Sequence, residues 1–443
     1  MPNGSPVNLP KHSIRQPHEG SSREGYGMSR KIHIGYIVLR MDVGGVERSI
    51  TRLLDGLPKD RYRMTVICLD RSGKAMEWVE NKEVQVIELH KSPGWDFRAI
   101  GKLAEMIQSQ QIDIIQSHNW GTLFESVWAN RSRFARHIHA ERGTVLGPPS
   151  KSRIKTMLKA RLMRHAIGRV DLVMSNSYAT ADKVRKTTGL ADLRVEVIPN
   201  GLVHPYSESP QTDPGWNTVR EKTRSGLGVG PSDLLIGVVG RLSPVKNFEL
   251  ALSGFAAFLK ATRSPDGMEV PSEASMASGS PRRFLMVLVG DGPCRESLEK
   301  LARELGISDS VEFVGEKKDA WPYYAAMDIF MSTSHSEGMS QSILEAMASG
   351  KAIIATDVGD ARQMLDSDHC GRTLGESNVL ALRTALVELS ESVQVRQQIA
   401  SNAVERFQNL YSLSSMLDRF DGMYQRLINE VGSRKPNPTV AHE

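Results

Sequence analysis

The sequence feature that constrains the fold most is a repeated alternation of short apolar runs with longer amphipathic segments from residue 31 onward. A buried parallel strand reads as a short apolar run, and the helix that crosses to the next strand reads as an amphipathic segment. The first unit is an apolar run at 32–38, a turn at Gly44 and Gly45, and then apolar residues at helical spacing. The alternation therefore predicts an α/β chain of doubly wound parallel sheets.

The alternation occurs in two series, and the 443 residues are enough for two or three domains. Strands are expected at 32–38, 64–69, 84–89, 112–117 and 195–201 in the first series, and at 234–240, 284–290, 311–314, 329–334 and 352–356 in the second. A polar stretch between 261 and 281 predicts a surface insertion. The expected organisation is a disordered tail (1–29), a first Rossmann-like domain (30–202), a second (203–411), a C-terminal helix that packs back on the first domain (412–430), and a tail (431–443).

Composition removes several classes of protein. The chain has 56 Lys plus Arg against 51 Asp plus Glu, and no run approaches the roughly 18 apolar residues of a membrane-spanning helix. The first 29 residues lack the apolar stretch of a secretory signal, and Met28 directly precedes the first strand, so translation starts at Met1 or at Met28. Three widely spaced cysteines indicate reduced thiols and a cytoplasmic protein: Cys68, Cys294 and Cys370.

The segment from Glu337 to Glu345 is the most informative about chemistry. A helix is expected to begin near Ser340, so the backbone N–H groups of Gly338, Met339 and Ser340 lie at a helix N-terminus, where phosphate binds well. Two carboxylates beside an anion site repel the anion unless they bind hydroxyl groups. The segment thus favours a ligand with both phosphate and polyol groups, such as a sugar nucleotide. The alternative makes Glu337 a helix-entry charge and Glu345 a solvated residue.

Two cations, Arg241 and Lys246, follow the first strand of the second series. Arginine as a fork and lysine as a point charge suit a diphosphate without a metal ion, although two surface cations are the simpler alternative. Gly44 and Gly45 follow the first strand of the first series. They allow close backbone approach or form an ordinary turn, because no G-x-G-x-x-G follows that strand.

Together these motifs resemble the retaining, GT-B-fold glycosyltransferases of family 4. The resemblance covers about residues 30–424 and is carried by the segments 44–48, 117–118, 198–201, 239–247, 289–293, 311–315 and 337–345. It implies a GT-B fold of two Rossmann-like domains that face each other across a cleft. The first domain would bind the acceptor, and the second would bind the nucleotide sugar.

The resemblance also implies a role for each matched residue of the second domain. Glu337 would bind hydroxyl groups of the donor sugar, Glu345 those of the ribose, and Arg241 with Lys246 the departing diphosphate. The oxygen of the leaving phosphate would deprotonate the acceptor hydroxyl, which gives retention of configuration without a protein nucleophile. Neither a metal ion nor another cofactor is expected.

Further matches and departures concern the first domain and the loop after Glu337. Gly45 would let the backbone approach the phosphate or sugar, and His118, at the end of a strand, would face the donor sugar or have a structural role. Met339 stands where the family often has a small residue. Gly359-Asp360 stands where it often has two glycines, so the sugar identity stays open.

Two other segments have competing interpretations. Asp366-Ser-Asp368 spells the D-x-D of a metal-binding glycosyltransferase fold, but it follows a helical stretch and enters a turn, which favours a solvent loop. The segment 151–169 contains no acidic residue and has apolar residues at helical spacing. It predicts either an interfacial helix on anionic lipid or a solvated basic helix. Nucleic-acid binding is disfavoured because aromatic residues are not interleaved with the cations.

The sequence therefore predicts a metal-independent, hexosyltransferase-like enzyme that moves a sugar from a nucleoside diphosphate sugar to a lipid-linked or glycan acceptor. Such an enzyme would serve cell-surface polysaccharide or glycolipid synthesis, in the cytoplasm or at the inner face of the membrane. The alternatives are a sugar-nucleotide epimerase or phosphorylase, and a noncatalytic glycan- or membrane-binding protein of the same fold.

Overall fold

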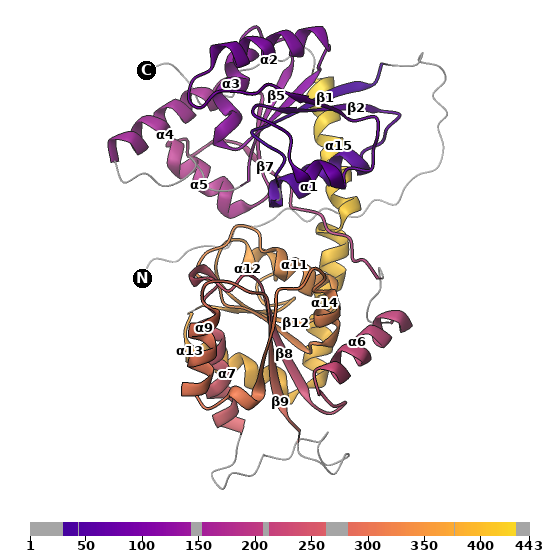
Figure 1. Cartoon of the computed structure of the whole chain (residues 1–443), viewed down its shortest axis with the longest axis vertical. Coiled ribbons are helices and arrows are strands. Elements are labelled where there is room, and N and C mark those ends of the chain that lie inside the picture. The colour runs from indigo at the N-terminus through magenta and orange to yellow at the C-terminus, as the bar shows by residue number, and fades with distance from the viewer. Residues whose placement is uncertain are drawn as a thin grey trace. The chain divides into compact units, whose positions relative to one another are not determined.

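The computed structural model describes residues 30–42, 44–142, 153–206, 212–262, 282–375 and 377–430. The expected tails at 1–29 and 431–443, the alternative start at Met28 and most of the polar stretch at 261–281 lie outside the described residues. From Ile32 onward, strands and helices alternate along the described chain (Figure 1).

The first sheet has seven parallel strands in the order β3-β2-β1-β4-β5-β6-β7. The strands are β1 (Ile32–Val38), β2 (Tyr62–Cys68), β3 (Gln85–Glu88), β4 (Ile114–His118), β5 (Arg136–Glu141), β6 (Leu172–Ser175) and β7 (Val195–Val197). The helices between them are α1 (Gly45–Gly56), α2 (Phe97–Ser109), α3 (Trp120–Ala129), α4 (Arg153–Ile167) and α5 (Tyr178–Thr188), with a 3-10 helix η1 (Lys74–Trp78).

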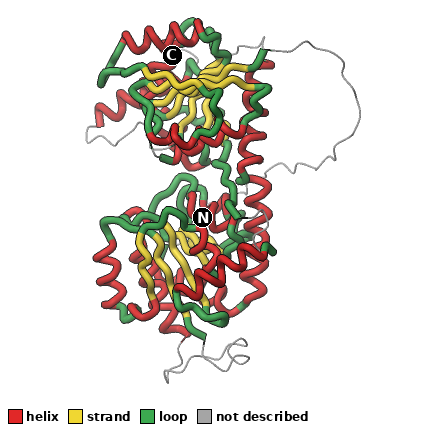
Figure 2. Tube along the Cα trace, turned by 45° about the vertical axis from the view of Figure 1, so that its right-hand side comes forward, coloured by secondary structure: helices red, strands yellow, loops and turns green. Residues whose placement is uncertain are grey.

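The second sheet has six parallel strands in the order β10-β9-β8-β11-β12-β13. The strands are β8 (Leu234–Val239), β9 (Phe284–Val289), β10 (Val311–Gly315), β11 (Ile329–Ser332), β12 (Ala352–Thr356) and β13 (Arg372–Leu374). The helices are α6 (Pro214–Gly226), α7 (Phe248–Thr262), α9 (Arg295–Glu304), α10 (Trp321–Ala326), α11 (Gln341–Ala348), α12 (Ala361–Met364), α13 (Val379–Glu391), α14 (Val393–Leu410) and α15 (Leu413–Asn429), with η2 (Pro244–Lys246) and η3 (Ser308–Ser310). Figure 2 shows the two groups of strands, each with helices on both faces.

The structure confirms the α/β class with two doubly wound parallel sheets. Strands β1 and β12 have the expected bounds, whereas the strand expected at 195–201 ends at Val197. Pro199 follows two residues later and has no N–H to donate to a sheet. Strands β5, β6 and β13 were not expected, because β5 carries alternating polar residues and the other two are only four and three residues long.

Helix α15, at the C-terminal end of the described chain, packs against the first sheet. Phe420 and Tyr424 share a hydrophobic core with Tyr36 of β1. The Tyr424 hydroxyl also donates a hydrogen bond to Oε1 of Gln116 on β4, at 2.6 Å. The chain thus passes from the first sheet to the second and returns to the first. None of the helices in the described ranges combines the length and hydropathy needed to cross a bilayer.

Candidate functional site

A cavity of 640 Å³ brings together residues that follow strands of both sheets. Gly45 at the start of α1 and Arg142 after β5 line it from the first sheet, and Glu337, Gly338 and Met339 line it from the loop between β11 and α11. Its other polar lining residues are Asn176, Thr180, Lys183, Thr187, Asn200, Ser336 and Gln341. The carboxyl ends of parallel strands are where open α/β sheets bind ligands, so the cavity lies where the fold favours a site.

The Glu337 carboxylate is paired with Lys246, although the two residues are 91 positions apart. The Lys246 Nζ lies 2.6 Å from Glu337 Oε1, and the Ser334 hydroxyl donates to the same oxygen at 2.7 Å. The pairing is possible because β8 and β11 are neighbours, so the loops that follow them meet. The fold thus brings these two predicted site residues into contact.

The loop that carries Glu337 is held by Gly359, which has a φ of +61°. A Cβ atom at this position would collide with the carbonyl oxygens of Gly338 and Glu337. The N–H of Asp360 donates to the Gly338 carbonyl at 2.9 Å. A glycine is therefore required here for two reasons: there is no room for a Cβ atom, and the backbone is left-handed, a conformation that glycine adopts at little cost.

Backbone N–H groups are available at the N-terminus of α11. Ser340 is the N-cap, and its side chain makes no capping hydrogen bond. Among the described residues, none accepts a hydrogen bond from the N–H of Gly338, Met339 or Ser340. Free N–H groups together with the positive end of the helix dipole form a site for an anion.

The two cations expected at the diphosphate differ in their surroundings. Arg241 is exposed and makes no hydrogen bond or ion pair within the described ranges. The Lys246 side chain is 25% exposed and uses one of its three donors on Glu337. Both therefore have donors left for a ligand.

Glu345 is half-buried on α11, so the interpretation of this residue as a solvated surface charge was wrong. The Tyr324 hydroxyl donates to its Oε2 at 2.8 Å. Burial raises the pKa of the Glu345 carboxyl, and the hydrogen bond from Tyr324 and the positive charges of Arg48 and Arg52 on α1 oppose that rise. The carboxylate thus lies among donors from elements of both sheets.

His118 ends β4 and lines a neighbouring cavity of 370 Å³, which shares Val46 with the larger cavity. Its ring is buried, and its Nδ1 has no hydrogen-bond partner in the described structure. Burial lowers the pKa of the imidazole well below its ordinary value, and the charge of Arg142 lowers it further. A neutral imidazole at pH 7 can donate a hydrogen bond to a sugar hydroxyl or accept one from it.

Arg142 is a cavity residue that sequence reasoning missed. Its Nη1 donates to the Ser49 hydroxyl, and the guanidinium carbon lies 5.6 Å from the Phe420 ring centroid. Its Nε and Nη2 are buried without a partner in the described structure. Burial lowers the pKa of Arg142 to about 10, so it is still protonated at pH 7. The available signal was a pair of charged residues, Glu141 and Arg142, at the end of an alternating run.

Asp360, where the family often has glycine, caps helix α5 of the first sheet. Its carboxylate accepts hydrogen bonds from the N–H groups of Tyr178 and Ala179 at 2.9 and 2.8 Å, and from the Ser177 hydroxyl at 3.2 Å. A carboxylate at a helix N-terminus is favoured by the helix dipole. The departure from the family pattern thus links a loop of the second sheet to a helix of the first.

The carboxylates of Asp366 and Asp368 do not converge on a common point. Both residues have positive φ, and Asp366 lies 3.4 Å from Arg406 while Asp368 accepts a hydrogen bond from the N–H of Thr373. These contacts agree with the solvent-loop interpretation. No group of three or more His, Cys, Asp or Glu residues in the described ranges is placed to hold a metal ion.

The basic helix expected at 151–169 corresponds to α4. Residues 151–152 and the side chains of 153–155 lie outside the described part. Met163, Ala166 and Ile167 are buried in a core with α3, whereas Met157 and Leu158 are more than half exposed. One apolar side of the helix thus packs on the domain, and another is left uncovered.

Solved structures identify the class of fold. A glycosyltransferase from Rickettsia africae superimposes with a TM-score of 0.71 at 18% identity, covering 91% of this chain and all of that one. Anabaena Alr3699/HepE in complex with UDP gives 0.68 at 21% identity, covering 90% and 100%. The two doubly wound sheets and the similarity to these solved glycosyltransferases together identify the GT-B fold.

Family models then identify the family. The model described as "Glycosyl transferases group 1" matches residues 219–406, and that described as "Glycosyltransferase Family 4" matches residues 43–204. The chain belongs to the group 1, family 4 glycosyltransferases.

The names of the curated relatives mention different substrates. The chain is 23% identical over 346 residues to "D-inositol 3-phosphate glycosyltransferase" of Gordonia bronchialis, covering 73% of this chain and 68% of the relative. It is 26% identical over 339 residues to "Alpha-monoglucosyldiacylglycerol synthase" of Streptococcus pneumoniae, covering 71% and 68%. It is 20% identical over 400 residues to "UDP-Gal:alpha-D-GlcNAc-diphosphoundecaprenol alpha-1,3-galactosyltransferase" of Escherichia coli, covering 89% and 97%.

Proposed function

We propose that this glycosyltransferase moves a sugar from a nucleoside diphosphate sugar to a lipid-linked or glycan acceptor, with retention of configuration and without a metal ion. The observation that carries the proposal is the Glu337 loop. Its carboxylate lies 2.6 Å from the Lys246 ammonium, next to the free N–H groups of residues 338–340. Glu337, Gly338 and Met339 line the cavity of 640 Å³, and this combination of a carboxylate with backbone N–H groups suits the hydroxyl and phosphate groups of a sugar nucleotide.

The names of relatives support both substrates. Anabaena Alr3699/HepE has been solved with UDP-glucose, and the Escherichia coli relative is named for UDP-Gal and a diphosphoundecaprenol acceptor. The Streptococcus pneumoniae relative is named for a glucosyldiacylglycerol. These names support a donor that carries a nucleoside diphosphate and an acceptor that is lipid-linked or a glycan.

The proposed step breaks the bond between the anomeric carbon and the diphosphate and forms a bond to the acceptor oxygen on the same face. The departing phosphate oxygen takes the acceptor proton. Arg241 and Lys246 stabilise the negative charge that grows on the diphosphate, since charge-assisted hydrogen bonds strengthen as the charge develops. Glu337 and neutral His118 bind sugar hydroxyls, and Glu345 binds the ribose.

We expect the purified full chain to release nucleoside diphosphate from at least one donor in a panel of UDP-, GDP- and ADP-sugars, and to do so equally in EDTA. The cations and the α11 N-terminus would supply the charge that a metal supplies elsewhere. Coupled detection of nucleoside diphosphate measures the release. Absence of release with every donor would favour the noncatalytic alternative, and loss in EDTA that Mn²⁺ restores would contradict metal independence.

We also propose that the surface formed by helices α2, α3 and α4 binds anionic lipid at the inner face of the membrane. Helix α3 packs beside both α2 and α4 (Figure 1). A row of aromatic rings with successive centroid distances of 4.9 to 6.3 Å runs between α3 and the start of α2, through Trp120, Phe124, Trp95, Phe97 and Trp128. Trp95 and Phe97 are 57% and 65% exposed, and Lys159 of α4 lies 6.0 Å from the Trp120 ring centroid. Exposed aromatic rings beside cations are typical of interfacial surfaces.

Vesicles that contain anionic lipid should bind the protein at low salt. Each cation near such a surface contributes about 1 kcal/mol, so replacing Lys159, Arg161 and Arg164 by Gln should weaken binding roughly 100-fold. Co-sedimentation with anionic and neutral vesicles measures it, and salt should weaken it because the Debye length falls. The matched control replaces three exposed lysines elsewhere, Lys222, Lys260 and Lys300, by Gln. Equal loss in both variants, or no binding by the wild type, would contradict this surface.

A further inference from the structure

A third cavity, of 570 Å³, lies at the amino ends of strands of the second sheet, away from the Glu337 loop. Its lining includes Asp328 and Lys351, which directly precede strands β11 and β12. The Glu337 loop follows the carboxyl end of β11 instead. Since a strand of four or five residues advances about 3.3 Å per residue, the two sites are roughly 15 Å apart or more. The volume is in the range of small-molecule sites.

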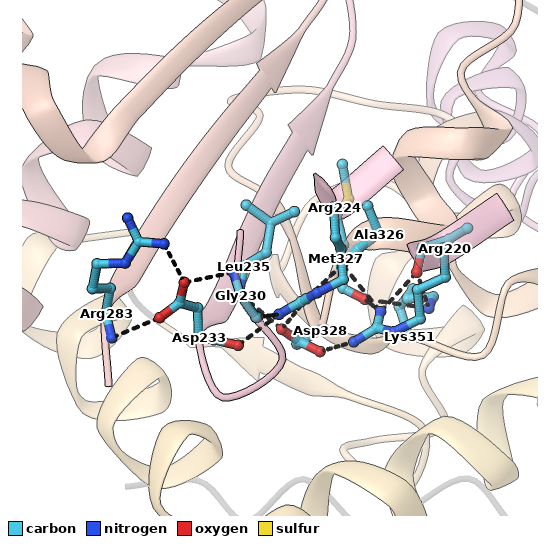
Figure 3. A network of polar contacts seen from close by, with 11 residues as sticks. Arg220, Arg224, Gly230, Asp233, Leu235, Arg283, Ala326, Met327, Asp328 and Lys351 are labelled. Atoms are coloured by element: carbon cyan, nitrogen blue, oxygen red, sulfur yellow. Dashed lines mark hydrogen bonds and ion pairs between the residues drawn. The ribbon is translucent and has the colours of Figure 1, made fainter. Parts of the chain in front are cut away.

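The cavity wall has more positive than negative charge. Arg220, Lys351 and Arg396 line it, and Asp328 is the acidic residue in the lining. Asp328 is already shared, because its Oδ1 lies 2.5 Å from Arg220 Nη2 and its Oδ2 lies 3.0 Å from Arg224 Nη1 (Figure 3). The lining thus has three basic side chains and one carboxylate, and a ligand anion would compensate the excess.

Part of this charge is compensated by carbonyl groups at helix ends. Arg220 Nη1 donates to the carbonyl oxygens of residues 325–327 at the end of α10, and Lys351 Nζ donates to two of the same oxygens at 3.2 and 3.3 Å. Arg396 Nη1 donates to two carbonyls at the end of α13. A helix C-terminus carries only about half a negative charge, so two helix ends cannot neutralise the excess.

Several donors at the cavity remain unused. The Lys351 ammonium has three donors and makes two hydrogen bonds, and Arg396 uses only Nη1 within the described ranges. The Ser349 hydroxyl is 1% exposed, lines the cavity and has no partner in the described structure. Burial lowers the pKa of Lys351 to about 7, which an anion beside it would reverse. Unsatisfied buried donors of this kind are rare in folded proteins.

We propose that this cavity binds a phosphate-bearing small molecule, with Lys351, Arg396 and Ser349 as donors to the phosphate. Arginine and lysine together are the usual partners of a phosphate dianion. Asn217 and Gln397 on the wall suit hydroxyl groups, and the ring of Trp216 forms an apolar side. A sugar phosphate therefore fits the wall more completely than inorganic phosphate does.

The site is separate from the donor site but structurally connected to it. Ser349 is the C-cap of α11, and Ser340 at the other end of this eight-residue helix is next to the proposed donor anion site. Binding in the cavity does not depend on the proposed transfer reaction. The two proposals can therefore fail independently.

Isothermal titration of the full chain with inorganic phosphate and with glucose 6-phosphate, each against chloride at equal ionic strength, tests the site. We expect both to bind, glucose 6-phosphate more tightly, and Arg396→Gln and Lys351→Met to weaken binding about tenfold or more, as loss of a charge-assisted hydrogen bond implies. Arg241→Gln, which changes a cation at the donor site, should bind as the wild type does.

Arg396→Gln keeps the test valid if Lys351→Met does not fold, because Arg396 is only partly buried on α14, whereas Lys351 is buried. Circular dichroism before titration verifies the fold of each variant. Absence of binding by the wild type, wild-type binding in Arg396→Gln, or loss only in Arg241→Gln would overturn the proposal. Equal affinity for the two anions would overturn the assignment of the hydroxyl-binding wall.

Discussion

Replacing Lys246 by alanine should lower kcat for sugar transfer by about 100- to 1000-fold, the effect of removing one group that stabilises developing charge. The Lys246 ammonium touches the Glu337 carboxylate and has two donors left for the diphosphate. Interaction with a leaving group strengthens as its charge grows, so the loss should appear in kcat more than in the affinity for the donor. Steady-state kinetics with saturating donor measure it.

Arg241→Ala is the matched comparison for Lys246→Ala. Arg241 is exposed and has no partner within the described ranges, so its removal leaves no buried group unpaired. Lys246→Ala, in contrast, leaves the Glu337 carboxylate with the Ser334 hydroxyl alone and should also lower the melting temperature. Both variants should lose turnover, but only Lys246→Ala should lose stability. Wild-type kcat in both would show that the diphosphate binds elsewhere.

The residues of the second sheet's site could be predicted because their signals are local. Glu337 lies on the loop before α11 and Glu345 lies in the second turn of that helix, and the glycine and serine between them mark the helix start. The contact between Lys246 and Glu337 could not be derived from spacing alone. It depends on β8 pairing with β11, although β9 and β10 come between them in the sequence.

Strand β5 shows why other parts could not be predicted. His137 and His139 alternate with apolar residues, a pattern typical of a half-exposed strand, yet the strand is buried. One ring nitrogen of each imidazole lies 2.9 Å from the Ser117 hydroxyl on β4, so a polar contact between strands holds both rings in the core, although His139 Nε2 has no hydrogen-bond partner in the described structure. The cap that Asp360 provides to α5 could not be predicted from the sequence either, since the partners are more than 180 residues apart. Long-range polar pairing does not leave a periodic signal.

Arg142 follows β5 and was missed for the same reason. Its Nε and Nη2 are buried without a partner, and its side chain lines the cavity that contains Glu337. An unsatisfied buried group costs about 1–3 kcal/mol, and more when it is charged. A protein that retains such a group gains little stability from it, so we infer that the guanidinium binds an anionic part of a substrate.

Replacing Arg142 by methionine should therefore separate activity from stability. Methionine retains the apolar packing on Phe420 and removes the unpaired donors, so the free energy of unfolding should rise by roughly 1 kcal/mol, after the loss of the hydrogen bond to Ser49 is subtracted. The same change should lower kcat/KM about 100-fold or more, because a bound anion would lose its charge-assisted hydrogen bonds. Chemical denaturation and steady-state kinetics measure the two effects.

Arg142→Lys is the control that keeps the charge and loses the planar fork, and it should recover only part of the activity. A purely structural arginine predicts the opposite pattern, in which Arg142→Met lowers the free energy of unfolding and leaves kcat/KM unchanged. The two interpretations thus differ in the sign of the stability change. A rise in stability with a loss of activity is the result expected of a residue that is kept for its ligand, since functional sites commonly retain groups that destabilise the free protein.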